Sequence, residues 1–461
     1  MDNKLLRFFV TLFMLTLSGC ASAPHDGTGA MQPVMEPDVE SHPSPEQVPE
    51  QPEPADGNDV MTLTKALSLA LVHNPELKVF AWEVRAAEAR ALQVGLWPNP
   101  EIGINIENVA GTNGISGLDG RTTTLQLGQL LELGGKRAKR TTVASLEKEI
   151  SQWDYEAKRL EVFSAVVKAF VEALAAQERL SLAEDMGKLS GELVETVSQR
   201  VEAGKDSPVE KAKAGVVLSN ARIRRQQALK NLEFSYKQLA ATWGSTSPRF
   251  KKVSGVLSVT PVPAIEELSA LLEWNPSIVR SSLAVDRQKA ALELEKAKVI
   301  SDVTLSGGVR RFEQTDDGAM VFGFAMPIPL LNRNQGGRLE ATHNLAKARE
   351  EDRAVRVGLG IELAAAYQAL SSAHAEVSEL DANVLQDAQS LFEASREGYS
   401  QGKLDYLDLL DAQRTLFEVR ERYIEAIRSY HLAKADVDRL IKRDLSTLPG
   451  ARETKLGRDN K

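Results

Sequence analysis

The sequence is poor in cysteine and in aromatic residues. Cys20 is the only cysteine among 461 residues, which excludes a disulfide bond within the chain. Phe, Trp and Tyr together make up 5% of the residues, whereas Ala, Leu, Glu, Lys, Arg and Gln dominate, a composition typical of long helices. The net charge of -8 argues against nucleic acid as a partner.

Patterns that would indicate catalysis or ligand binding are also missing from the sequence. The six histidines include no pair with the spacing of a metal site on one helix turn, and His374 falls in an apolar seam, where we expect a core residue. The Gly-Gly turns at 134 and 336 lack the Lys-Ser/Thr context of a phosphate loop. No catalytic triad or nucleophile elbow is apparent. We therefore expect neither an enzyme nor a bound cofactor or metal.

The N-terminus carries an export signal. An apolar run from residue 8 to 17 follows Lys4 and Arg7 and is too short to span a bilayer. It ends in Leu-Ser-Gly-Cys, which resembles a bacterial lipobox, so we expect residues 1–19 to be removed and Cys20 to be lipidated. The alternative is an ordinary signal peptide with a chance cysteine. No aspartate follows Cys20 directly, and we therefore expect the mature protein at the outer membrane.

The rest of the chain is a tandem duplication. The helical segment 66–77 returns as 267–278, each with an Asn-Pro pair at the same place. Each copy continues with two strands, a Gly-Gly-basic turn, a very long helix, a Gly-Lys reversal and a return helix. This order predicts two helical hairpins, each preceded by a β-hairpin. The predicted first repeat is 59–260, with strands 101–110 and 121–131, a long helix 136–203 and a return helix 208–242. The second is 261–445, with strands 302–312 and 319–328, a long helix 337–401 and a return helix 404–442. We expect the Pro- and Glu-rich residues 20–58 to be a disordered tether and residues 446–461 a flexible tail.

The long helices are expected to supercoil against their neighbours. No proline occurs between Lys136 and Ala203, and apolar residues recur in steps of three and four. Such a helix reaches about 100 Å, far more than a compact domain of this size needs, so we expect it to pack against the return helices and against copies of itself. The glycine pairs 187/191 and 358/360 are expected to mark small breaks.

The strands predict a membrane-spanning sheet that is shared between copies. Isoleucines alternate with small and polar residues in 102–107, and a similar alternation recurs in 303–309 and 322–326. Alternation over about ten residues is typical of transmembrane β-strands, although a half-buried sheet of a soluble protein is the alternative. Four strands cannot close a barrel, and an open edge in hydrocarbon leaves backbone groups unsatisfied. Three chains would together form a barrel of about twelve strands.

Together these parts resemble the TolC-like outer-membrane efflux family. The most specific stretch is Glu397–Ala412, similar to the family's signature at the periplasmic tip, and Arg200–Ala214 is a weaker version of it. Glu132–Arg137 and Pro327–Gly336 look like the branch that serves heavy-metal exporters, the CzcC type. The resemblance implies a mainly α fold with a small transmembrane β part: a homotrimer whose shared barrel of about twelve strands continues as a long α-helical coiled-coil tunnel through the periplasm.

The resemblance also assigns roles near the Gly402 reversal. Asp408 and Asp411 share one helix face. Together with Asp405 they are expected to line the periplasmic constriction, where three copies would form rings of carboxylates that favour cations. Tyr399 and Glu210 are expected in the contacts between helices that hold the constriction shut.

Two features of this region are less straightforward. The alternative to a lining role is that the aspartates complement the dipole at the start of the return helix. This alternative applies more to Asp405 than to Asp408 and Asp411. Leu404 stands where the family has a gating arginine. A salt bridge that holds the constriction shut is therefore in doubt for this chain. The surface expected to dock an adaptor consists of the two hairpin tips, with Gly204, Lys205, Gly402 and Lys403.

These features predict a passive, lipid-anchored outer-membrane duct. Its expected partners are a periplasmic adaptor and an inner-membrane pump of the resistance-nodulation-division type, and its expected cargo is divalent metal ions such as Co, Zn, Cd or Cu. One alternative keeps the duct but has it carry drugs or, as in type I secretion, proteins. Another is a structural coiled-coil envelope lipoprotein without a pore.

Overall fold

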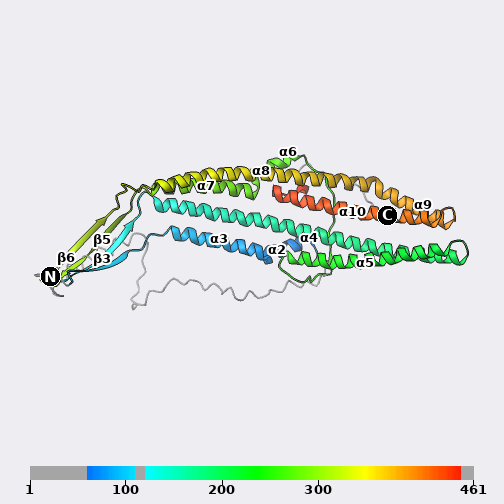
Figure 1. Cartoon of the computed structure of the whole chain (residues 1–461), viewed down its shortest axis with the longest axis horizontal. Coiled ribbons are helices and arrows are strands. Elements are labelled where there is room, and N and C mark those ends of the chain that lie inside the picture. The colour runs from blue at the N-terminus through cyan, green and yellow to red at the C-terminus, as the bar shows by residue number, and fades with distance from the viewer. Residues whose placement is uncertain (1–59, 110–119, 448–461) are drawn as a thin grey trace, which may run out of the picture. The chain divides into compact units, whose positions relative to one another are not determined.

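The computed structural model describes residues 60–109 and 120–447. The first repeat contains β1 (Val60–Met61), α2 (Leu63–His73), α3 (Pro75–Val94), β2 (Glu101–Glu107), β3 (Thr122–Leu131), α4 (Lys136–Glu202) and α5 (Pro208–Ala241). After β4 (Lys252–Val253), which pairs with β1, the second repeat contains α6 (Ile265–Leu271), η2 (Leu272–Trp274), α7 (Pro276–Ala297), β5 (Val303–Phe312), β6 (Asp317–Ala325), α8 (Gln335–Glu379), η3 (Leu380–Val384), α9 (Leu385–Ser400), α10 (Tyr406–Ile441) and η4 (Leu445–Thr447). The expected mainly helical, duplicated fold is confirmed (Figure 1). The predicted lipidation site Cys20 and tether lie outside the described residues.

Two buried asparagines fix matching helix ends in the two repeats. Asn74 caps α3, and its side-chain amide donates a hydrogen bond of 2.7 Å to the Thr242 carbonyl at the end of α5. Asn275 caps α7 and donates a hydrogen bond of 2.8 Å to the Leu440 carbonyl at the end of α10. Each asparagine therefore satisfies orphan backbone groups of two helices at once.

The long helices pass through the glycines that were expected to break them. α4 is continuous at Gly187 and Gly191, and α8 is continuous at Gly358 and Gly360, so that expectation was wrong. At all four positions an added Cβ would meet no other atom within 4 Å. These glycines therefore face open space on the helix surface.

The second long helix is interrupted instead by a π-helical turn, η3, between α8 and α9. The buried residues Ala183 and Ser190 of α4 are seven positions apart, whereas the matching buried residues, Leu380 and Ala388, are eight apart. A single inserted residue is what a π turn absorbs within a continuous helix. The π turn therefore keeps the residues that follow it facing the core.

The other four strands form one antiparallel sheet, in the order β2-β3-β5-β6. Ile104, Leu125, Val309 and Met320 lie side by side across one face and are 46–65% exposed. On the other face Gly308 packs so closely on β3 that a Cβ there would lie 2.2 Å from the Leu125 carbonyl oxygen. The outer edges of β2 and β6 have no neighbouring strand among the described residues.

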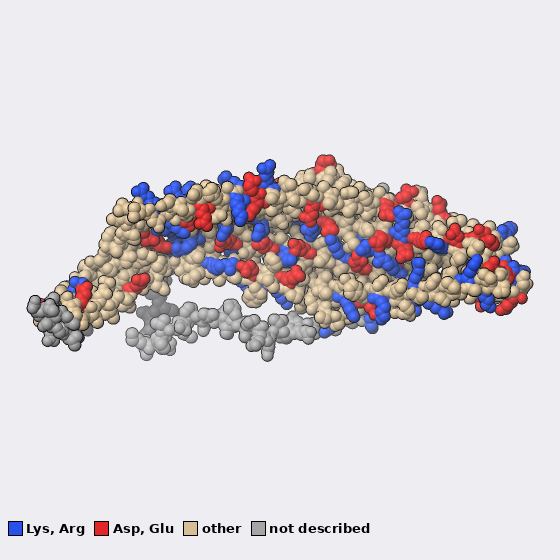
Figure 2. Space-filling model, viewed as in Figure 1, with Lys and Arg blue, Asp and Glu red and all other residues tan. Residues whose placement is uncertain are grey.

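The sheet and the hairpin tips lie at opposite ends of the helices (Figure 1). α4 follows β3 directly and has 67 residues, so its two ends are about 100 Å apart. Charged side chains are spread along the helices but are sparse over most of the strands (Figure 2). Within the described ranges, no helix contains a stretch apolar enough to cross a bilayer.

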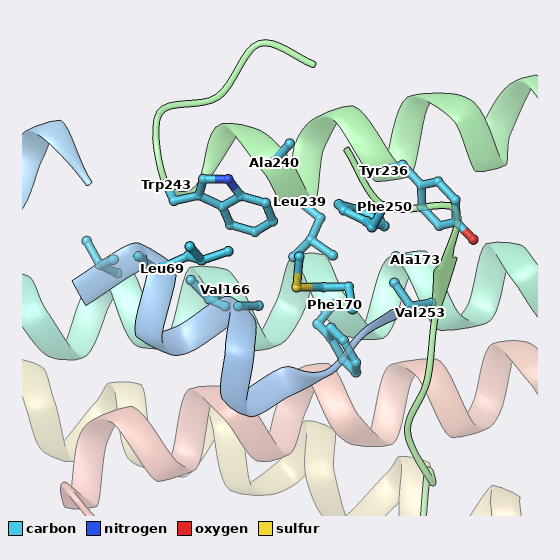
Figure 3. Close-up of a cluster of buried hydrophobic side chains, with 14 of the residues drawn as sticks. Leu69, Val166, Phe170, Ala173, Tyr236, Leu239, Ala240, Trp243, Phe250 and Val253 are labelled. Carbon is cyan, nitrogen blue, oxygen red and sulfur yellow. The ribbon is translucent and has the colours of Figure 1, made fainter. Parts of the chain in front are cut away.

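Three clusters of buried side chains hold the helices together. In the first, Leu69 of α2 packs with Val166 and Phe170 of α4 and Leu239 of α5 (Figure 3). The second cluster matches it in the other repeat and joins α8 to α10 around Tyr430. The third lies at the hairpin tips and combines side chains of α4, α5, α9 and α10.

Candidate functional site

Two glycine turns of the same geometry close the helical hairpins. Gly204 and Gly402 have φ angles of 69° and 72°, the left-handed conformation that favours glycine at a helix end. In each turn the N–H of the next residue, Lys205 or Lys403, bonds to a carbonyl in the last turn of the preceding helix, at 2.9 Å and 2.8 Å. Both lysines are exposed. The tips therefore present a basic side chain next to a sharply turned backbone.

A polar cluster joins the two tips. The Arg200 guanidinium forms a bidentate pair with Asp206, at 2.8 Å and 3.0 Å, across the first turn. The Tyr399 hydroxyl at the end of α9 donates a 2.5 Å hydrogen bond to the same carboxylate. Arg200 also donates to the Tyr399 carbonyl at 3.1 Å and lies over its ring, 4.5 Å from the centroid. We call Arg200, Asp206 and Tyr399 the tip cluster.

The tip cluster is largely shielded from water, which strengthens its polar contacts. Tyr399 is 2% exposed, and the Asp206 side chain is 8% exposed. The hydrogen bonds from Arg200 hold the pKa of Asp206 below its ordinary value, and the same pairing raises the pKa of Arg200. Burial, reinforced by the hydrogen bond to Asp206, raises the pKa of Tyr399. All three groups therefore keep their usual charge states at neutral pH.

Aromatic packing supports the tip cluster. The rings of Tyr399 and Tyr406 meet edge to face, with their centroids 6.1 Å apart, and both residues are 2% exposed. Glu210, in the first turn of α5, is close enough for its charge to raise the pKa of both tyrosines. The structure thus brings Glu210 and Tyr399 into one neighbourhood.

The three aspartates after Gly402 have different surroundings. Asp405 caps α10 by accepting a 3.0 Å hydrogen bond from the Asp408 N–H, and the Asp408 carboxylate accepts one of 3.3 Å from the Asp405 N–H. This is a reciprocal capping box. Asp411 lies one turn further along and takes no part in it. All three are exposed, so the capping role of Asp405 and Asp408 leaves their carboxylates facing water.

Leu404 packs tightly against the end of the preceding helix. A Cβ on Gly398 would lie 2.7 Å from a methyl carbon of Leu404, so these two residues fit together only because position 398 is a glycine. Leu404 therefore makes an apolar contact at the position where the resemblance led us to expect a gating arginine.

Sequence reasoning missed Arg200 and Asp206. They lie on either side of the first glycine turn. An arginine and an aspartate in these positions could have indicated an ion pair across the turn. Nothing in the sequence of the first hairpin indicated that their shared partner would be Tyr399, which comes from the other hairpin.

Among the described residues, no group of three or more His, Cys, Asp or Glu side chains could hold a metal ion. His374 lies beside the ring of Tyr430, with 6.1 Å between centroids.

Comparison with known proteins matches both repeats to one family. The family model described as "Outer membrane efflux protein" matches residues 66–245 and 268–441. The chain is 34% identical over 391 residues to the cobalt-zinc-cadmium resistance protein CzcC of Cupriavidus metallidurans, covering 85% of this chain and 92% of that protein. It is 28% identical to the nickel-cobalt-cadmium resistance protein NccC of Alcaligenes xylosoxydans xylosoxydans, covering 63% of this chain and 66% of that protein.

The fold is also similar to solved structures. A membrane protein from Pseudomonas aeruginosa superimposes with a TM-score of 0.70 at 19% identity, covering 82% of this chain and 93% of that chain. At this level of identity the likeness concerns the fold.

Proposed function

The chain belongs to the outer membrane efflux protein family, and from this we propose that three copies form the exit duct of a tripartite system that exports divalent heavy-metal cations. Members of this family are passive outer-membrane channels, and the chain is not an enzyme. The observation that carries the proposal is a four-stranded sheet with an exposed apolar face and two open edges.

The sheet supports a shared barrel. Its apolar row, from Ile104 to Met320, is suited to lipid, and the opposite face carries small and polar residues such as Gly308 and Gln126. In hydrocarbon the free edges of β2 and β6 would leave backbone groups unpaired, at several kcal/mol for each group. Pairing β6 of one copy with β2 of the next removes every edge, and three copies give a barrel of about twelve strands.

The helices extend this barrel into a tunnel. α4 is long enough to reach about 100 Å from the sheet, and a sheet in the outer membrane places the hairpin tips deep in the periplasm. The tips, with Gly204, Lys205, Gly402 and Lys403, are the proposed docking surface for a periplasmic adaptor, which links the duct to an inner-membrane pump of the resistance-nodulation-division type. Lipidated Cys20 would anchor the N-terminus in the membrane.

The tip also supplies the proposed selectivity. Threefold symmetry turns the exposed carboxylates of Asp408 and Asp411 into rings of negative charge, which favour cations and repel anions. Tyr399, in the tip cluster, and the nearby Glu210 fix the helices around this constriction. Cationic cargo agrees with the names of the two relatives, which are resistance proteins for cobalt, zinc, cadmium and nickel.

Planar-bilayer recordings on the purified protein test the proposal. We expect discrete conductance steps from a trimeric species, with cations preferred over anions. A stable trimer that never conducts would instead support a structural envelope lipoprotein. Cargo is tested separately in a strain that lacks the chain: greater sensitivity to cobalt, zinc or cadmium supports metal export, whereas greater sensitivity to antibiotics alone points to drug export.

A further inference from the structure

The connections between the sheet and the helices expose large apolar side chains. Trp97, in the connection before β2, is 57% exposed, and Ile328 and Leu330, in the connection after β6, are 71% and 69% exposed. Exposed apolar groups therefore continue beyond the strands, up to the level at which the long helices begin. Clusters of exposed apolar side chains mark surfaces that meet a membrane or another molecule.

The same level of the molecule is basic, although the whole chain has a net charge of -8. Residues 95–101, 132–140, 298–302 and 326–340 cover the connections between strands and helices and the first turns of α4 and α8. They contain seven Lys or Arg and four Asp or Glu residues, a net charge of +3. Figure 2 shows Lys and Arg side chains near the start of α8, next to strands that carry few charges. The junction therefore attracts anions.

Three arginines of this junction have no acidic partner. Two of the local carboxylates are already paired, Glu132 with Arg140 and Asp302 with Lys136, each at 2.7 Å. Within the described part of the chain, no carboxylate lies within ion-pair distance of the side chains of Arg137, Arg333 and Arg338. Their charges are therefore available to a ligand.

Arg137 is held by an aromatic ring instead of a carboxylate. Its guanidinium lies over the ring of Trp97, 4.1 Å from the centroid. Stacking of this kind orients the guanidinium and leaves the N–H groups at its edge free to pair with an anion. Arg333 and Arg338 are exposed to solvent. One oriented and two exposed guanidinium groups thus lie beside the exposed apolar side chains.

Helix stability does not explain these arginines. Arg137 and Arg338 lie in the first turns of α4 and α8, and neither turn contains an acidic residue. Acidic side chains are favoured at this end of a helix, whereas basic ones are unfavourable. A local conflict of this kind, repeated in both halves of the chain, is expected where a surface serves a function.

We propose that this junction binds anionic phospholipids of the periplasmic leaflet of the outer membrane. The inference rests on the proposed position of the sheet in that membrane and adds the lipid class that holds it at its depth. Arginine pairs bidentately with phosphate, tryptophan is favoured at the boundary between lipid and water, and basic side chains near a membrane surface attract anionic lipids. The surface consists of the junction collar, which is Trp97, Arg137, Ile328, Leu330, Arg333 and Arg338.

Each residue of the junction collar has a part in this contact. The guanidinium groups of Arg137, Arg333 and Arg338 pair with headgroup phosphates, and their aliphatic stems lie along the adjacent apolar surface. Trp97, Ile328 and Leu330 lie among the first carbons of the acyl chains. Both halves of an anionic phospholipid are thereby matched, the charge by arginine and the chains by apolar groups.

Native mass spectrometry of the full-length protein, titrated with phosphatidylglycerol or with phosphatidylethanolamine, tests the lipid preference. We expect tighter binding of phosphatidylglycerol. Its affinity should fall about fivefold for each arginine replaced in the series Arg137→Gln, Arg333→Gln and Arg338→Gln, as when one basic side chain leaves an anionic surface. Arg311→Gln is the matched control, because Arg311 is an exposed arginine at the other end of β5 and pairs with Asp316. It should leave the preference unchanged.

Tryptophan fluorescence tests the depth of the junction collar. Phosphatidylglycerol that carries bromine on its acyl chains should quench the fluorescence of the native protein in vesicles, and Trp97→Phe should lose most of this quenching. Trp274→Phe is the control, because Trp274 is even more exposed, at 69%, but lies beyond the far end of α7 from the sheet. It should leave the quenching in place.

The results separate this inference from the proposed function. Equal binding of the two lipids, or an unchanged preference when all three arginines are replaced, overturns the lipid site. Displacement of phosphatidylglycerol by an equal concentration of inorganic phosphate would assign the arginines to free phosphate and also overturn it. A trimer that conducts without a lipid preference refutes this inference alone, whereas absence of trimers and of conductance refutes the proposed function. Arg333→Gln and Arg338→Gln singly replace the combined variant if that variant does not assemble.

Discussion

The Tyr399 hydroxyl donates a 2.5 Å hydrogen bond to Asp206, which joins the tip of the second helical hairpin to the turn of the first. Asp206 is already paired with Arg200 in that turn. One buried carboxylate therefore organises both tips, and the surface proposed to meet an adaptor depends on it.

Removal of the Tyr399 hydroxyl should loosen the tips. In Tyr399→Phe the ring still packs against Tyr406, but a hydrogen bond to a charged group is lost, which costs about 1.5–3 kcal/mol. Limited trypsin digestion should then cut faster at Lys205 and Lys403. Tyr406→Phe is the matched control, because its ring is equally buried and its hydroxyl has no hydrogen-bond partner among the described residues. Equal cleavage rates in the two variants would show that the hydrogen bond is not what holds the tips.

The glycine turns should depend on backbone conformation alone. At Gly204 and Gly402 an added Cβ meets nothing within 4 Å, yet φ is positive, so alanine at either position should destabilise its turn by about 1–2 kcal/mol. Gly187→Ala, inside α4 and equally free of contacts, should instead stabilise the helix by about 0.5–1 kcal/mol. Thermal unfolding is the measurement: the unfolding temperature should fall for Gly204→Ala and Gly402→Ala and rise for Gly187→Ala. A rise for all three variants would contradict the role of the positive φ angles.

The tip aspartates should separate into a capping and a lining role. Asp405→Ala removes the cap of α10 and should cost about 1 kcal/mol with little change in ion selectivity. Asp411→Asn leaves the cap intact and should weaken cation preference in single-channel recordings without changing thermal stability. If Asp411→Asn leaves selectivity unchanged, Asp411 does not line the constriction.

The second repeat should lose stability in mild acid through His431. Burial lowers the pKa of His431 from 6.5 to about 4, with a smaller contribution from the charge of Lys434. At a pH between these two pKa values, His431 is protonated in the unfolded chain but stays neutral in the folded chain. The free energy of unfolding therefore falls as the pH drops from 6.5 toward 4, by up to about 3 kcal/mol.

The measurement is thermal unfolding at about pH 7.5 and about pH 5, for the native chain and for His431→Gln. The variant should have a smaller pH dependence because it has no group that titrates at this position. His343→Gln, which replaces an exposed histidine on α8, should behave like the native chain. An unchanged pH dependence in His431→Gln would assign the effect to other groups.

Most of the fold could be predicted because it follows from repeated local patterns. The Asn-Pro pairs, the Gly-Lys reversals and the steps of three and four specify caps, turns and buried helix faces, and each of these is a local property of the chain. For the aspartates after Gly402 the sequence suggested, as an alternative, only that they complement a helix dipole; the reciprocal capping hydrogen bonds of Asp405 and Asp408 were not predicted.

Features that depend on the meeting of distant segments could not be predicted. The π turn follows from one extra residue between Leu380 and Ala388, which becomes visible only once the buried positions of both repeats are known. Asp206 gains its significance from Tyr399, which is far away in the sequence. The sequence predicts helix breaks at Gly187 and Gly358 because glycine has a low helix propensity, but tertiary packing of the long helices outweighs that preference.

The central claim is that the chain forms a pore only as a ring of copies. Its most direct test combines a mass measurement of the purified, detergent-solubilised protein with single-channel recording of the same preparation. The account predicts a trimer that inserts into lipid and conducts in discrete, cation-preferring steps. A stable monomer that leaves the bilayer intact would contradict it.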